Sequence, residues 1–150
     1  MSIDLKVILT SEIPELLNYE EHRLMEQGLP EDEAKISAWS APWRKEALEH
    51  YIPMGWSFLA RDLDGKLLGY FLAQPILFFD RQTQSLWVEH LQASSLLARD
   101  ALTDLACRLS RDKHLQRVYF PNLPHIQNAV ACYKPEPWGF QSIFIKTTKA

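Results

Sequence analysis

The feature that most constrains the fold is a run of three strand-like segments joined by short turns. An Asp-Gly dipeptide lies within the first turn, Asp62–Gly65, and this pair favours a tight hairpin. The second turn, residues 80–83, is polar. Segments this close in sequence pair with one another, so the run predicts an antiparallel meander. Pro75 predicts a bulge or bend in the second strand, because proline donates no ladder hydrogen bond. The three segments are residues 56–61, 66–79 and 85–91.

Helical segments precede the meander. Ser11 is followed by apolar residues at helical spacing, and Gly28 and Pro30 end that pattern. A second helical region spans residues 31–51, and Pro42 predicts that it divides into two short helices. Ahead of both, alternation of apolar residues over 3–9 predicts a strand.

An amphipathic helix follows the meander and begins at Ser94 or Ser95. A short strand over 116–120 comes next, so the strand–helix–strand step from Val88 to Val118 predicts a right-handed parallel crossover. The chain then reads as a helix and a last strand. These two elements are expected over residues 123–133 and 140–147.

The element order defines the fold class. It predicts an α+β protein of the α/β three-layer type, with a mixed, mostly antiparallel sheet and one parallel crossover pair. The 150 residues fit one domain, 1–150, with no repeat or linker.

Composition and charge exclude several function classes. A net charge of −3 lacks the basic excess of nucleic-acid binders, so no nucleic-acid partner is expected. No apolar run reaches the ~18 residues of a membrane span, and the first residues do not resemble a signal peptide. We therefore expect a cytoplasmic protein without a membrane partner. The two cysteines and five histidines lack ligand spacing, so no metal site is expected.

The element order resembles that of the GCN5-related N-acetyltransferases (GNAT) over most of the chain, from Leu5 to Ile145. Supporting motifs are Gly65-Lys-Leu-Leu-Gly-Tyr-Phe-Leu, Leu86-Trp-Val and the ending Ala129…Tyr133…Gly139-Phe140. The resemblance implies a GNAT-like sheet with helices on both faces. It also implies acetyl-CoA as co-substrate, a small-molecule or peptide amine as acceptor, and direct attack in a ternary complex. By analogy a homodimer is expected, with exposed apolar residues near Phe78 suited to one.

The phosphate-binding loop of that family has the pattern Gln/Arg-x-x-Gly-x-Gly/Ala, which falls on residues 93–98. Ala98 matches, whereas Leu96 takes the place of the central glycine. Free amides at a helix N-terminus stabilise phosphate oxygens whatever the side chains are. An ordinary N-cap is the alternative for the two serines. The resemblance implies these cofactor-binding residues: Val88, His90, Ser94, Ser95, Leu96, Leu97, Ala98 and Asn128.

Two residues carry the catalytic hypothesis. Tyr133 takes the position of the family's general acid, which protonates the leaving thiolate. Glu89 is the candidate base on the strand before the loop, and strand alternation predicts that Glu89 and His90 point to opposite faces. A buried aromatic and a structural ion pair are the respective alternatives.

The acceptor site is expected in the segment before the meander. Trp39 and Trp43 are candidates for a cleft wall, and Arg44 for charge selection. Packing of these helices on the sheet is the alternative. Because the loop lacks its glycine, a non-catalytic GNAT-like domain that binds a ligand or a protein is the second function hypothesis.

Overall fold

A five-stranded sheet with the order β1-β2-β3-β4-β5 forms the centre of the protein. The computed structural model describes residues 2–139 and 142–148. The strands are β1 (Asp4–Val7), β2 (Phe58–Arg61), β3 (Leu67–Phe79), β4 (Gln82–Ala93) and β5 (Val118–Tyr119). The helices are α1 (Ile13–Glu26), α2 (Glu31–Ser37), α3 (Lys45–Tyr51), α4 (Leu96–Asp112) and α5 (Pro124–Val130). Single 3-10 turns η1 (Thr10–Glu12), η2 (Ile52–Met54) and η3 (Ala131–Tyr133) complete the described elements.

The pairing confirms the predicted meander and crossover. Strands β2, β3 and β4 pair antiparallel in chain order, and β1 joins the edge of β2. Strand β5 returns parallel to β4 after α4. The first hairpin turn forms as expected: Gly65 has φ +85°, and the Asp62 carboxylate accepts hydrogen bonds from the backbone of Asp64 and Lys66, each at 2.9 Å.

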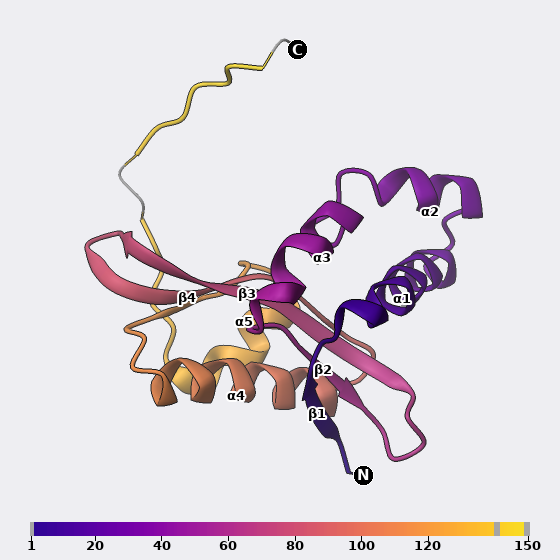
Figure 1. The fold of residues 1–150 in the computed structure, drawn as a ribbon, viewed down its shortest axis with the longest axis horizontal. Helices are drawn as coiled ribbons and strands as arrows, with labels where there is room; N and C mark the ends of the chain where they lie inside the picture. Colours follow the sequence, from indigo (N-terminus) through magenta and orange to yellow (C-terminus); the bar gives the residue numbers. More distant parts are fainter. Residues whose placement is uncertain (1, 140–141, 149–150) are drawn as a thin grey trace.

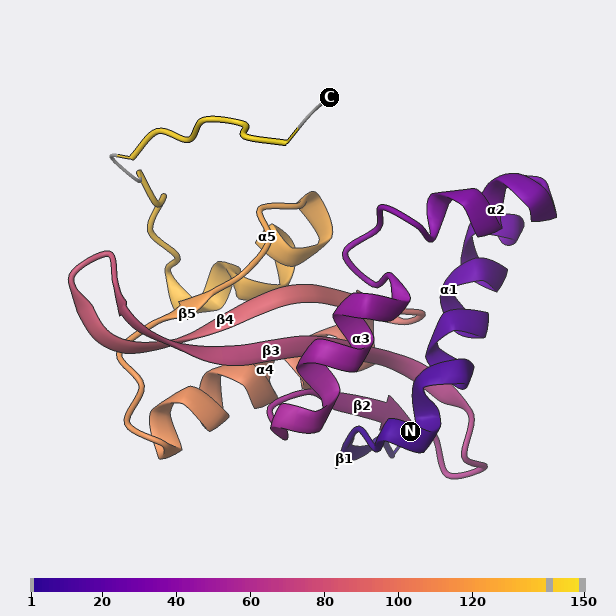
Figure 2. The same ribbon diagram turned by 45° about the horizontal axis from the view of Figure 1, so that its top comes forward.

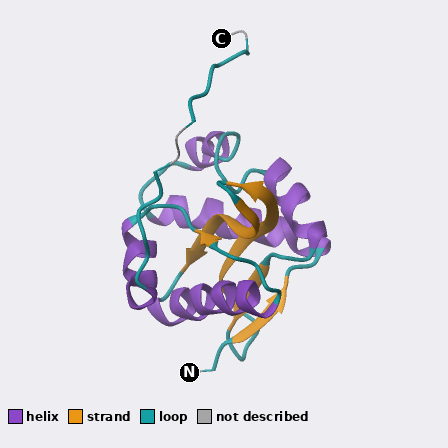
Figure 3. Cartoon of the chain, turned by 90° about the vertical axis from the view of Figure 1, so that its left-hand side faces the viewer, coloured by secondary structure: helices purple, strands orange, loops and turns teal. Residues whose placement is uncertain are grey.

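Helices cover both faces of this sheet (Figures 1 and 2), which confirms the predicted fold class. Helices α1 and α3 lie on one face, and we call this side the α1/α3 face. Helices α4 and α5 lie on the other, the α4/α5 face, and Figure 3 shows the strands between the helical layers. The α1/α3 core includes Leu16, Leu48, Leu59, Tyr70 and Leu72. The α4/α5 core includes Phe71, Val88, Leu91, Leu102 and Ile126.

The bulge in the meander lies elsewhere than predicted. Pro75 pairs regularly with Leu86, and the register shifts instead between Leu72 and Ala73. The prediction of a bulge at Pro75 is wrong for a geometric reason. The Leu86 N–H points to β5, where it donates to Arg117, so the opposite residue Pro75 turns its nitrogen away from β4. Proline at that position costs no hydrogen bond to β4.

The predicted last strand does not form in the described part of the tail. Residues 140–141 of the predicted range lie outside the described residues, and residues 142–147 have no strand structure. Three large apolar side chains there are 79–92% exposed: Ile143, Phe144 and Ile145. β-Branched and aromatic residues such as these favour a strand, but a strand also needs a neighbouring strand to pair with. Here the described tail has no such pairing.

Candidate functional site

The bulge places two consecutive ionisable residues on the same face. Leu72 pairs with His90 and Ala73 pairs with Val88, so Glu89 is the extra residue of β4. Glu89 accepts a hydrogen bond from Tyr51 of α3, and the His90 ring lies against Glu20 of α1. The neighbours Val88 and Leu91 both pack in the α4/α5 core. The prediction that Glu89 and His90 point to opposite faces is wrong, because an inserted residue breaks the alternation.

The Glu89 carboxylate is held by two donors. Trp87 Nε1 donates to Glu89 Oε2 at 2.7 Å, and the Tyr51 hydroxyl donates to the same oxygen at 3.1 Å. Burial and the negative charge of Glu89 raise the pKa of Tyr51, so the phenol remains a neutral donor. Arg44, exposed at the start of α3, exerts a weaker opposing charge effect on Tyr51. The Glu89 carboxylate is therefore fixed in position by one donor from β4 and one from α3.

A buried polar cluster occupies the same face next to Glu89. The Glu20 side chain on α1 is fully buried, 3.1 Å from Arg23 Nη2 and 3.5 Å from His90 Nε2. The His90 ring lies 5.5 Å from that of Tyr70, whose pKa is raised well above its usual range by burial and then by Glu20. A buried carboxylate is stabilised by opposite charge and by hydrogen-bond donors, and the Arg23 guanidinium and the His90 ring lie against it. The His90 side chain is thus engaged by α1.

Strands β4 and β5 separate soon after they pair. The parallel pairing comprises Leu86 with Val118 and Trp87 with Tyr119. Beyond that point β4 continues to Ala93, and its edge toward β5 has no strand partner among the described residues. We call the space beside residues 88–93 the splay. An edge of this kind presents backbone donors and acceptors to an amide-bearing ligand.

Helix α4 begins at the end of the splay. Ser95 is its N-cap, and its hydroxyl accepts from the Ala98 N–H at 3.1 Å. The Ser94 hydroxyl lies 2.7 Å from that of Tyr19 on α1. Within the described residues, no acceptor pairs with the amides of Leu96 and Leu97. The N-cap interpretation is therefore confirmed for Ser95. The amides of Leu96 and Leu97 are free to bind an anion at the N-terminus of this 17-residue helix.

The structure gives a reason for Gly69, the second glycine of the Gly65-Lys-Leu-Leu-Gly-Tyr-Phe-Leu motif. It pairs with Ala93 at the last position of β4. A Cβ atom at Gly69 would lie 2.5 Å from the Gln92 carbonyl oxygen and 2.8 Å from the Ala93 Cα. The two backbones therefore approach closely immediately before the α4 N-terminus, and glycine is needed for contact rather than for a left-handed φ.

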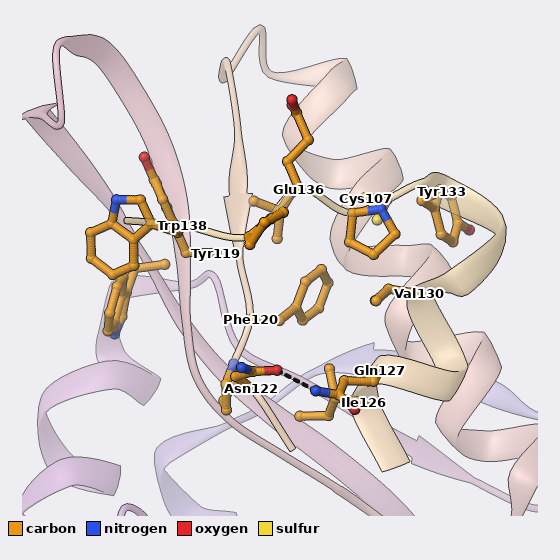
Figure 4. A pocket seen from close by; sticks show the side chains of 15 residues that line it. Cys107, Tyr119, Phe120, Asn122, Ile126, Gln127, Val130, Tyr133, Glu136 and Trp138 are labelled. Carbon is orange, nitrogen blue, oxygen red and sulfur yellow. Dashed lines mark hydrogen bonds between the residues drawn. The ribbon is translucent and has the colours of Figure 1, made fainter. Parts of the chain in front are cut away.

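A cavity of about 600 Å³ lies beside β5, between α5, η3 and the chain segment 135–138 (Figure 4). Trp138 closes one side: its ring centroid is 5.1 Å from that of Tyr119 and 6.3 Å from that of Trp87. The Trp138 indole also donates to Asp80 at 3.0 Å. The segment after η3 is thus attached to the tip of the β3–β4 hairpin.

Tyr133 lines this cavity, but its hydroxyl points away from the centre (Figure 4). It donates to Asp104 Oδ1 on α4 at 2.7 Å. That hydrogen bond and, to a lesser extent, burial raise the pKa of Tyr133 to about 12. Tyr133 is therefore held on the α4/α5 face, whereas Glu89 is held on the α1/α3 face. The two predicted catalytic residues are not brought together by a direct contact.

The remaining candidates are dispersed. Trp43 is buried in the α1/α3 core, whereas Trp39 is 78% exposed between α2 and α3. Trp39, Trp43 and Arg44 therefore do not form one wall. Asn128 is exposed on α5, while His125 of the same helix donates from Nε2 to the Leu91 carbonyl oxygen at 3.2 Å. The contacts of His125, Tyr51 and Glu20 with β4 were not predicted from the sequence, because no spacing links any of these residues to β4.

The Tyr133–Asp104 hydrogen bond gives a prediction for alkaline stability. The folded-state pKa of Tyr133 is raised, so its contribution is complete below about pH 10 and disappears as pH rises through about 12. The stability difference between wild type and Tyr133→Phe should be small, because the side chain is partly exposed, and should vanish over that pH range. Urea unfolding at several pH values measures this difference. A difference that does not change between pH 9 and 12 would contradict it.

No family model matches this sequence, and no curated protein does. Solved structures do match. A GCN5-related N-acetyltransferase from Ralstonia eutropha gives a TM-score of 0.67 at 14% identity, covering 96% of this chain and 99% of that one. A predicted acetyltransferase with acetyl-CoA from Clostridium acetobutylicum gives 0.63 at 6% identity, covering 97% and 96%. A ribosomal-protein-alanine N-acetyltransferase from Brucella melitensis gives 0.61 at 14% identity, covering 97% and 99%.

The chain therefore has the fold of the GCN5-related N-acetyltransferases, as its element order predicted. Within the described ranges, no three side chains of His, Cys, Asp or Glu gather to hold a metal ion. No described helix has the length and apolar character needed to cross a bilayer.

Proposed function

We propose that this protein is an N-acyltransferase that uses acetyl-CoA and transfers the acetyl group to an amine by direct attack. The observation that carries the proposal is the splay: a parallel pair opens after Trp87–Tyr119, directly beside the free amides at the α4 N-terminus. Both features occur in a chain that matches acetyltransferase structures over nearly its whole length. Acetyl-CoA would supply the activated thioester carbonyl.

The residues of the splay fit such a ligand. The pantetheine arm contains amide groups, and the β4 edge over residues 88–93 offers backbone partners for them. The Leu96 and Leu97 amides are suited to the pyrophosphate, since they add to the positive end of the α4 dipole. The Leu96 side chain is 69% exposed, so its volume is directed mainly into solvent.

The proposed chemistry uses residues of both faces. Glu89 would receive the amine proton at Oε1, because Oε2 already accepts from Trp87 and Tyr51. Holding the amine beside the thioester would supply much of the rate. Tyr133 would protonate the thiolate after leaving Asp104, and its raised pKa keeps the phenol protonated at neutral pH. We propose a small-molecule or peptide amine as acceptor, entering from the α1/α3 face beside Arg44.

Ligand-dependent stability tests this proposal. Acetyl-CoA at about 100 times its Kd should raise the melting temperature by roughly 5–10 °C. Leu96→Asp should abolish most of that shift, because a carboxylate at the first turn repels phosphate while remaining compatible with the helix dipole. Leu96→Gly should increase the affinity several-fold by allowing closer approach of the phosphate.

Leu63→Asp is the matched control, since Leu63 is 81% exposed in the β2–β3 turn, outside the proposed site. It should bind acetyl-CoA like the wild type. If millimolar acetyl-CoA raises the melting temperature of neither the wild type nor Leu96→Gly, the proposal is overturned.

Leu96 in place of glycine favours one second candidate, a non-catalytic domain of the same fold. Release of free thiol from acetyl-CoA distinguishes the two functions. Amine-dependent thiol release that Glu89→Gln slows at least 100-fold supports the acyltransferase. Binding of acetyl-CoA without any amine-dependent release supports the non-catalytic domain.

A further inference from the structure

One side chain crosses the splay from the opposite wall. His125 lies in the first turn of α5, and its Nε2 is 3.2 Å from the Leu91 carbonyl oxygen. A carbonyl oxygen can only accept, so Nε2 carries the hydrogen in this contact. Leu91 lies in the middle of the β4 edge left without a strand partner, while its other side faces Phe71 of β3.

The contact satisfies an acceptor that the separation of β4 and β5 leaves unpaired. Backbone carbonyls in such half-buried places are stabilised by a partner, and His125 supplies it in the free protein. In the proposed function, an amide N–H of the pantetheine arm would donate to this same stretch of edge. The imidazole and the ligand amide would then compete for one oxygen atom.

We propose that His125 is a latch that closes the splay in the free protein and must release Leu91 before acetyl-CoA can occupy it. This inference rests on the proposed function. It gives α5 a residue that controls ligand entry. His125 contacts β4, whereas Ile126 is buried in the core and Asn128 is exposed. The latch exchanges one hydrogen bond for another, so it lowers affinity without blocking binding.

The test compares two ligands and two variants by isothermal titration calorimetry. Acetyl-CoA carries the arm that competes with His125, whereas adenosine 3′,5′-bisphosphate lacks it. His125→Ala should bind acetyl-CoA about fivefold more tightly than the wild type, the effect of removing one competing hydrogen bond. The same variant should bind adenosine 3′,5′-bisphosphate with unchanged affinity. His125→Gln retains an N–H donor and should bind acetyl-CoA nearly as the wild type does.

A spectroscopic readout follows the latch directly. The imidazole nitrogen resonances of His125 should shift when acetyl-CoA is added and stay unchanged with adenosine 3′,5′-bisphosphate. Equal or weaker acetyl-CoA binding by His125→Ala, with the bisphosphate still bound, overturns the latch and leaves the proposed function standing. Failure of both the wild type and His125→Ala to bind millimolar acetyl-CoA overturns both proposals.

Discussion

Replacing Glu20 by alanine is expected to lower the free energy of unfolding by about 3–5 kcal/mol. Glu20 is the fully buried carboxylate of α1, paired with Arg23 and His90. Removing one member of a buried pair leaves the other charge without compensation and opens a cavity. For a chain of this length the loss corresponds to a fall in melting temperature of roughly 10 °C.

Urea unfolding measures this effect, and two further variants sharpen it. Glu26→Ala removes an exposed carboxylate from the same helix, where it pairs with His22, and should change stability by less than about 0.5 kcal/mol. Glu20→Gln keeps the shape and hydrogen-bonding ability, so it should cost less than Glu20→Ala. If Glu20→Ala and Glu26→Ala cost the same small amount, the buried cluster does not stabilise the fold.

Gly69→Ala is the second substitution with a large expected effect. The new methyl group would meet the Gln92 carbonyl oxygen at 2.5 Å and the Ala93 Cα at 2.8 Å, and a backbone cannot rotate aside as a side chain can. We expect a cost of about 2–3 kcal/mol, since β3 and β4 must separate locally. Because Ala93 leads directly into the α4 N-terminus, acetyl-CoA affinity should fall as well.

Gly139→Ala is the control for this prediction, because a Cβ atom at Gly139 meets nothing within 4 Å. It should leave both stability and acetyl-CoA affinity unchanged. Thermal unfolding of the two variants with and without acetyl-CoA gives both quantities. A Gly69→Ala protein as stable as Gly139→Ala would show that the strands accommodate the methyl group at no cost.

The parts of the fold predicted correctly depend on short-range patterns. In the first hairpin turn, the Asp62 carboxylate accepts a hydrogen bond from the turn backbone, and Gly65 supplies the positive φ. The α4 region shows its apolar spacing and its N-cap within a few residues. The tail has a short run of strand-forming residues, Ile143-Phe144-Ile145, yet residues 142–147 form no strand, because pairing depends on a partner that the local sequence does not specify.

The candidate site was predictable only in part. The position of the turn that we propose as the phosphate site followed from the order of the elements, and Ser95 caps the helix as its residue type suggests. The contacts that give Glu89 its environment come from Tyr51, 38 residues away, and those of His90 from Glu20, 70 residues away. Tyr133 was recognised by motif, but its hydrogen bond to Asp104 depends on how η3 packs against α4.

The sequence by itself determined the order of elements as far as α5, the meander, the parallel crossover and the start of α4, because each depends on spacing between near neighbours. Only the tertiary structure decided which face Glu89 occupies. That outcome depends on one extra residue opposite Leu72 and Ala73, and it reverses the alternation for the rest of β4. The tertiary structure also brought His125 to Leu91. Contacts between distant segments arise from packing, and packing is settled only when the whole core is assembled.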